Sequence, residues 1–232
     1  MAMAIAASPL LAPSGPNLIG GSGSAGNLIA YNSGDGITVG GTDGTKATSM
    51  LGNKIYANGK LGIDLGGNGI TVNDANDADT GTNDLLNFPI LANITESGGN
   101  LIIKGCAPAG IAGATTVELF EADVSAGGKA TPGDNKFGKS KDYGEGQTYL
   151  ASFEEGSASD TDTATCAIAT DADGNNHTGM NAFTVTIPTP AGFVTGDSMT
   201  ATATLSNSGT SEFSPLFCCW KCTMLPVKST KT

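Results

Sequence analysis

The chain has 232 residues, of which 6% are aromatic, 14% are charged and 34 are glycine. Its formal net charge is −11 and every basic residue is a lysine, so the cationic footprint that nucleic-acid binding requires is missing. Gly, Ser, Thr, Asn and Asp are abundant and no stretch has sustained helical periodicity, which favours a turn-dense all-β protein.

The N-terminal segment, residues 1–11, is apolar but too short to span a membrane, so we expect no membrane insertion. It also lacks the basic region of a signal peptide. We interpret residues 3–6 as the last strand of an earlier coil, which implies a longer natural protein. The low charge density is typical of exported proteins and predicts an extracellular or cell-surface location.

A pattern then repeats at a displacement of 26 residues: segments 26–32 and 36–39 match segments 52–58 and 62–65. Short apolar strands between Gly and Asn corners at this spacing are typical of a solenoid, whose coils stack to bury their apolar side chains. Residues 17–21 resemble a further strand of this kind.

Equivalent positions of the repeat are expected to lie one above the other. The inward-pointing residues are Ile29, Ile37, Ile55 and Ile63. The corner amides Asn27 and Asn53, and likewise Asn32 and Asn58, should form side-chain ladders. The corner glycines Gly26, Gly36, Gly52 and Gly62 should supply positive φ angles.

An acidic segment follows the last repeat and contains Asn73, Asp74, Asn76, Asp77, Asp79, Asn83 and Asp84. Oxygen ligands at short spacing suit Ca²⁺, and we take Asp74, Asp77, Asp79 and Asp84 as candidate ligands. The segment lacks the central Gly and terminal Glu of an EF-hand. Asp and Asn also build turns through their own side chains, so the alternative is a solvated capping turn.

Beyond Pro89, seven strand-like runs alternate with turns: 90–94, 100–105, 115–121, 148–153, 165–169, 182–187 and 198–205. Alternation within 116–120 and 183–187 gives each of these strands one buried face. The pattern predicts an immunoglobulin-like β-sandwich. Residues 122–143 are expected to form an exposed loop.

Several segments resemble the end of the right-handed parallel β-helix in large bacterial surface or secreted proteins. They are residues 62–66, 69–71, 73–81, 83 and 87–91, and residues 144–150, 200–204 and 210–214 resemble the β-sandwich module that follows the β-helix in this family. The resemblance implies three parts: the C-terminal coils of a β-helix over residues 1–87, a β-sandwich over 88–215 and an irregular tail over 216–232.

Catalytic patterns are weak. Parallel β-helices include pectate lyases and polygalacturonases, but Asp64, predicted to point outward, has no second carboxylate on its strand one coil away. There is no arginine to abstract a proton and no Gly-His-Gly motif. His177, the sole histidine, lies in a polar turn that we expect to be exposed, and no nucleophile elbow precedes it.

The five cysteines are Cys106, Cys166, Cys218, Cys219 and Cys222. An odd number in an exported protein leaves one thiol outside any internal pair. Cys106 and Cys166 lie in predicted strands and pair if those strands are neighbours. Cys219 and Cys222 form a C-x-x-C without the further ligands of a zinc site or the βαβ context of a redox motif.

The favoured interpretation is a non-enzymatic exported surface protein with a structural, adhesive or carbohydrate-contacting role. No cofactor is required, apart from the Ca²⁺ candidate. Surface glycans or envelope components are the expected partners, because stacked coils present flat, repetitive faces. The alternatives are a rigid spacer, and a fragment of a β-helix polysaccharide lyase or glycoside hydrolase whose catalytic coils lie upstream.

Overall fold

The computed structural model describes residues 17–40, 47–109, 115–122, 138–194 and 196–218. In these ranges the chain is all-β, with two short 3-10 helices, η1 (Gly23–Ala25) and η2 (Thr82–Leu85). None of the helices in the described ranges is long and apolar enough to cross a membrane. The strand predicted at residues 3–6 and the pair Cys219 and Cys222 lie outside the described residues.

Six short strands in the first part pair in parallel, one for one. They are β1 (Asn17–Gly20), β2 (Leu28–Ala30), β3 (Ile37–Val39), β4 (Thr48–Leu51), β5 (Lys54–Tyr56) and β6 (Ile63–Leu65). β1 pairs with β4, β2 with β5 and β3 with β6. We call β1–β3 the first triplet and β4–β6 the second triplet.

The register of two pairs has the displacement predicted from the sequence. Ile29 lies beside Ile55 and Ile37 beside Ile63, and all four are buried. The displacement between β1 and β4 is 31 residues instead of 26, because η1 lengthens the connection between β1 and β2.

The corner amides form the predicted contacts. Asn27 donates its Nδ2 to Asn53 Oδ1 at 3.1 Å, and Asn32 donates to Asn58 Oδ1 at 2.8 Å. Each acceptor also receives the backbone N–H of its partner. The amides therefore tie the two triplets together at both corners.

The explanation for the corner glycines is wrong at three of the four positions. Only Gly52 has a left-handed φ, +64°. Gly26 is required by close approach, since a Cβ there would lie 1.8 Å from the carbonyl oxygen of Gly52. The left-handed corner residues are instead Tyr31 and Ala57, with φ of 61° and 54°.

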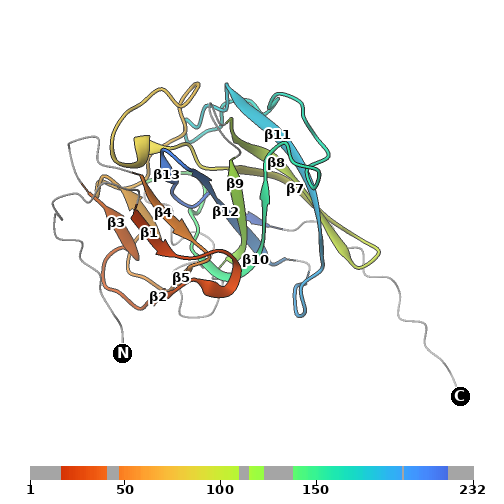
Figure 1. Ribbon diagram of the computed structural model, residues 1–232, viewed down its shortest axis with the longest axis horizontal. Helices are drawn as coiled ribbons and strands as arrows, with labels where there is room; N and C mark the ends of the chain where they lie inside the picture. The colour runs from red at the N-terminus through yellow and green to blue at the C-terminus, as the bar shows by residue number, and fades with distance from the viewer. Residues whose placement is uncertain (1–16, 41–46, 110–114, 123–137, 195, 219–232) are drawn as a thin grey trace, which may run out of the picture.

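The second part contains two antiparallel sheets around a shared core, and we call it the two-sheet unit (Figure 1). Its strands are β7 (Ile90–Ser97), β8 (Asn100–Pro108), β9 (Thr116–Ala122), β10 (Gly146–Glu154), β11 (Met180–Pro188), β12 (Ser198–Leu205), β13 (Gly209–Thr210) and β14 (Phe217–Cys218). One sheet has the order β10-β9-β12-β13, with β14 also on β12, and the other has the order β11-β8-β7.

Two predictions about this unit are wrong, and a third is tested only in part. The run 165–169 is no strand and makes a single bridge, from Thr165 to Asn181. The tail predicted to be irregular begins with strand β14, which pairs with β12. Of the exposed loop predicted at 122–143, residues 123–137 lie outside the described ranges. Residues 138–142 are irregular and exposed or half-buried, as predicted, whereas Tyr143 at the end is buried.

Strand β9 is buried on both faces, whereas the alternation of apolar and polar residues in its sequence predicts only one buried face. Val117 and Leu119 face the core between the sheets, and Phe120 joins the apolar core of the triplets with Phe213. The rings of Phe120 and Phe213 pack edge to face at 5.5 Å. Because the triplets cover the second face of this sheet, even Glu118 is only 1% exposed.

Candidate functional site

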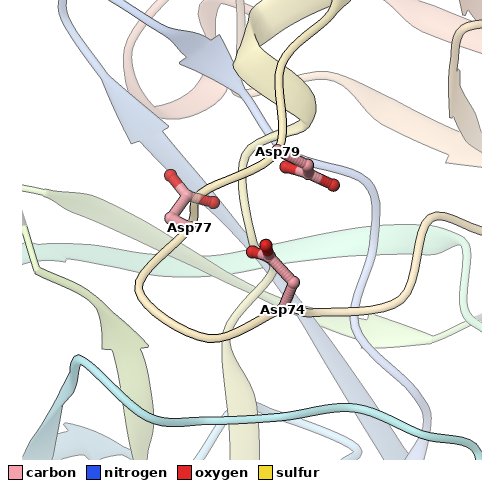
Figure 2. Close-up of side chains that lie close together, drawn as sticks. All are labelled: Asp74, Asp77 and Asp79. Carbon is pink, nitrogen blue, oxygen red and sulfur yellow. The ribbon is translucent and has the colours of Figure 1, made fainter.

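The acidic loop between β6 and β7 brings three of its four predicted metal ligands together. One carboxylate oxygen each of Asp74, Asp77 and Asp79 lies within 4.8 Å of the others (Figure 2). The fourth candidate, Asp84, is exposed and stands outside this group. We call the three residues the Asp cluster.

Hydrogen bonds between its ends hold the loop in shape. Asn87 accepts the N–H of Asp74 and donates its Nδ2 to the carbonyl of Asp74, both at 2.9 Å. The N–H of Asn87 donates to Asp77 Oδ1 at 2.7 Å, and Ala78 N–H donates to both Asp74 oxygens at 3.0 and 3.2 Å. The capping-turn role expected of these side chains is therefore present for Asp74 and Asp77.

Asp79 differs, because its Oδ1 is buried and accepts no hydrogen bond. Burial, reinforced by the charges of Asp74 and Asp77, raises the pKa of Asp79 to about 6. Burial also raises the pKa of Asp77, with smaller contributions from Asp74 and Asp84. Converging carboxylates without a neutralising partner are the donor set that a hard cation such as Ca²⁺ prefers.

A second concentration of carboxylates lies where the second triplet meets the two-sheet unit. Each strand of the second triplet pairs with the first triplet along one edge only. The N–H groups along the other edge need acceptors, because an unpaired buried N–H is costly. Side chains from the two-sheet unit and the acidic loop supply these acceptors.

Three buried glutamates carry most of this role, and we call them the carboxylate cap. Glu118 accepts the N–H of Gly52 with both oxygens, at 3.0 Å each. Glu145 accepts the N–H of Asn58 at 3.3 Å and its Nδ2 at 2.8 Å.

Glu212 completes the carboxylate cap at the third strand. Its Oε1 accepts the N–H of Leu65 at 2.9 Å, and its Oε2 accepts that of Thr71 at 3.0 Å. All three glutamates are at most 3% exposed. The carboxylate cap thus meets an N–H at or just after each strand of the second triplet.

Neutral side chains close the rest of this edge. Asn83 Oδ1 accepts the N–H of Thr48 at 2.8 Å, and Asn83 Nδ2 donates to the carbonyls of Thr48 and Thr210. Thr210 Oγ1 accepts the N–H of Met50 at 2.7 Å. The backbone of Asn83 is left-handed, with a φ of 50°.

The carboxylate cap is electrostatically unusual. Among the described residues, no lysine forms an ion pair with Glu118 or Glu212, and the ion pair between Lys141 and Asp171 lies elsewhere. Burial raises the pKa of Glu118 to about 7 and that of Glu212 to about 8, although the backbone N–H donors lower both. Both side chains therefore titrate near neutral pH, where exposed glutamates are fully ionised.

Two expectations about potential catalytic residues are wrong. Asp64 was expected to point outward but is 3% exposed, and its oxygens accept the N–H groups of Asn68 and Gly69. His177 is 2% exposed, and neither ring nitrogen has a hydrogen-bond partner. Burial lowers the pKa of His177 and keeps the ring neutral.

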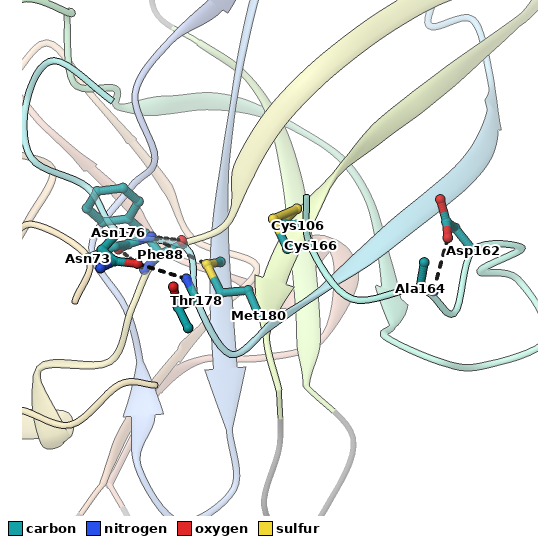
Figure 3. The surroundings of a disulfide bond; sticks show 9 residues. All are labelled: Asn73, Phe88, Cys106, Asp162, Ala164, Cys166, Asn176, Thr178 and Met180. Carbon is teal, nitrogen blue, oxygen red and sulfur yellow. Dashed lines mark hydrogen bonds between the residues drawn. A yellow bond between two sulfur atoms is a disulfide. The ribbon is translucent and has the colours of Figure 1, made fainter. Parts of the chain in front are cut away.

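The predicted pair Cys106 and Cys166 forms a disulfide, with the Cα atoms 5.7 Å apart (Figure 3). Cys106 lies in β8, and Cys166 lies in the connection between β10 and β11. Cys166 N–H also donates to the carbonyl of Met180 at 2.9 Å. The disulfide thus holds a long irregular connection against the sheet.

The carboxylate cap was missed at the sequence level. Segments 144–150 and 210–214, which contain Glu145 and Glu212, carry part of the family resemblance, but no role followed for either glutamate. A single acidic residue inside an otherwise uncharged strand, such as Glu118, was the available signal. No protein-family model, curated protein or solved structure matches the chain.

Proposed function

We propose that this chain is part of a non-enzymatic, exported surface protein with a structural role. In this proposal the two triplets are coils of a right-handed parallel β-helix, and the two-sheet unit is an immunoglobulin-like β-sandwich that closes the stack. The carboxylate cap carries the proposal. Glu118, Glu145 and Glu212 supply acceptors where a further coil would otherwise supply carbonyls, so the stack ends at the second triplet.

The disulfide supports the exported location. Disulfides persist in oxidising compartments, which include the periplasm and the cell exterior. Cys106 and Cys166 close a separation of 60 residues, so their pairing stabilises the whole two-sheet unit. The surroundings outside the cell also offer the glycans and envelope components proposed as partners.

The state of the carboxylates weighs against the alternative of a polysaccharide lyase or glycoside hydrolase. Asp35 accepts the N–H of Leu61 at 3.1 Å, and Asp64 accepts two N–H groups of its own turn. Both carboxylates are thus engaged in holding corners. A hydrolase needs a pair of carboxylates that reach the substrate, whereas Asp64 is only 3% exposed.

An activity and binding assay tests the proposal. We would incubate the chain with neutral and uronate-containing polysaccharides and measure new reducing ends and unsaturated uronate. We expect neither product, and we expect retention on at least one surface polysaccharide in a pull-down. Turnover of any substrate that is abolished by Asp64→Asn would refute the structural role, because the same buried carboxylate would then be catalytic.

A second proposal concerns Ca²⁺, and the orphaned oxygen of Asp79 supports it. The Asp cluster would hold the ion and tie the loop between the two parts of the fold. At 100 times its Kd, Ca²⁺ would stabilise the chain by about 2.7 kcal/mol.

Thermal unfolding with EDTA and with Ca²⁺ tests this second proposal. We expect the wild type and Asp84→Asn to gain stability with Ca²⁺, and Asp79→Asn to gain none. Asp84→Asn is the matched control, since it removes a carboxylate of the same loop that lies outside the Asp cluster. An equal midpoint with EDTA and Ca²⁺ in the wild type would exclude the ion.

A further inference from the structure

The turn that follows β6 contains an exposed asparagine, Asn68, followed directly by a glycine, Gly69. Gly66, Gly67 and Gly69 all have left-handed φ angles, of 94°, 72° and 92°. Asn68 between them is exposed, and its carboxamide makes no hydrogen bond to any described residue. A Cβ added to Gly69 would meet nothing within 4 Å apart from its chain neighbours, so the space beside its Cα is open.

A carboxylate is already in contact with the backbone nitrogen of Gly69. Asp64 Oδ2 accepts the Gly69 N–H at 3.1 Å, and Asp64 Oδ1 accepts the Asn68 N–H at the same distance. Burial, with a contribution from the charge of Asp35, raises the pKa of Asp64. A raised pKa makes this carboxylate a stronger base than an exposed aspartate.

We propose that Asn68 is a site of spontaneous deamidation in which Asp64 acts as the general base. Asp64 Oδ2 takes the N–H proton while the Gly69 nitrogen attacks Asn68 Cγ. The bond from Cγ to Nδ2 then breaks, and the departing nitrogen takes the proton back and leaves as ammonia. The product is a five-membered succinimide.

Water completes the reaction by opening the succinimide. Attack at one carbonyl gives aspartate at position 68, and attack at the other gives isoaspartate. One water is consumed and one ammonia released, with no oxidant or reductant. Either product adds a negative charge beside Asp64, and isoaspartate also lengthens the backbone of the turn that follows β6.

The chain contains the same dipeptide in a protected state. Asn58 is 1% exposed, and its Nδ2 donates to the carbonyls of Ile29 and Tyr56 and to Glu145. The N–H of Gly59 donates to the Asn32 carbonyl at 2.7 Å. Since the carboxamide of Asn58 is clamped and buried, Asn58–Gly59 should resist the reaction that Asn68–Gly69 undergoes.

Peptide mapping by mass spectrometry tests the proposal on the full chain kept at neutral pH. We expect peptides containing Asn68 to acquire the mass of an acid and to split into aspartyl and isoaspartyl forms. Asn58 should stay intact. Asp64→Asn should slow the change at Asn68 on the order of 100-fold, the loss expected when a positioned general base is removed.

Asn58 also reports whether the variant folds, because unfolding would expose both dipeptides equally. An intact Asn68 in folded wild type, under conditions where urea-unfolded chain deamidates, would refute the site. Equal rates at Asn58 and Asn68 in the folded wild type would refute it too. An unchanged rate at Asn68 in Asp64→Asn, with Asn58 still protected, would refute the role of Asp64. If Asn58 loses protection in Asp64→Asn, Asp64→Glu replaces it and is expected to deamidate more slowly than the wild type.

Discussion

Replacing Glu212 by glutamine should change the stability of the chain in a way that depends on pH. Burial raises the pKa of Glu212 from its usual 4.5 to about 8 in the folded chain. The folded state therefore holds a proton that the unfolded state releases. The resulting stability is fully present below about pH 4.5 and is lost as the pH rises through about 8.

The magnitude follows from the width of this window. Stability falls by about 1.4 kcal/mol per pH unit for one proton, so the wild type loses roughly 4 kcal/mol between about pH 5 and about pH 8. Glutamine has the shape of the protonated acid and does not titrate, but its NH2 group carries two donors, so its single carbonyl oxygen replaces only one of the two acceptors that Glu212 offers to Leu65 and Thr71. Glu212→Gln should therefore be less stable than the wild type by about 1–2 kcal/mol at about pH 5, because one N–H loses its acceptor, and more stable by roughly 2 kcal/mol at about pH 9.

Urea unfolding followed by far-ultraviolet circular dichroism at these pH values measures the effect. Glu154→Gln, a change at an exposed position, is the matched control and should alter stability by less than about 0.5 kcal/mol at each pH. Glu212→Ala should lose about 2–4 kcal/mol at about pH 5, because the N–H groups of Leu65 and Thr71 then lack acceptors, and this loss should shrink toward zero at about pH 9, where the wild type has lost the stability that the Glu212 proton supplies. If Glu212→Gln is destabilised equally at all pH values, the carboxylate is ionised in the folded chain and the reasoning fails.

Three further changes test other parts of the fold by the same unfolding assay. Asn58→Ala removes a buried amide that contacts both triplets and Glu145, and it should cost about 2–4 kcal/mol of stability. The control Asn27→Ala, at an exposed corner, should cost less than half as much. Equal costs for the two variants would contradict the prediction. Gly26→Ala places a Cβ 1.8 Å from a carbonyl oxygen and should destabilise the chain by about 3 kcal/mol or more, and a neutral result would show that the corner can widen. Reducing the disulfide, which spans 60 residues, should cost about 4 kcal/mol, and an unchanged urea midpoint would show that the connection is held without it.

The strand register of the triplets could be predicted because the signal is local and periodic. Ile29 and Ile55, or Asn32 and Asn58, occupy matching places in two segments, and parallel pairing at one displacement satisfies apolar and amide positions together. The same logic failed for glycine. A corner needs either a left-handed residue or room for a neighbouring chain, and the sequence does not show that Ala57 serves the first need and Gly26 the second.

Burial of the polar residues could not be predicted, because it depends on what covers them. His177 lies among polar residues that are exposed in most turns, yet it is buried. Glu118 occupies the face of β9 that alternation assigns to solvent, and the triplets occupy that space instead. For the Asp cluster, short spacing sufficed to bring Asp74, Asp77 and Asp79 together, but the backbone turn excluded Asp84.

The need for acceptors at the unpaired edge of the second triplet nevertheless follows from a general physical requirement. A row of parallel strands that ends leaves buried N–H groups on its last edge, so acceptors must come from outside the row. Glutamates suit this role, because one carboxylate offers two oxygens and its stem reaches across a sheet. The donors and acceptors are 66, 87 and 147 residues apart in the chain, so no local spacing joins Gly52 to Glu118, Asn58 to Glu145 or Leu65 to Glu212. The second triplet has a strand partner on one edge only, so its other edge needs acceptors. Which residues supply them depends on how the two-sheet unit packs against that edge.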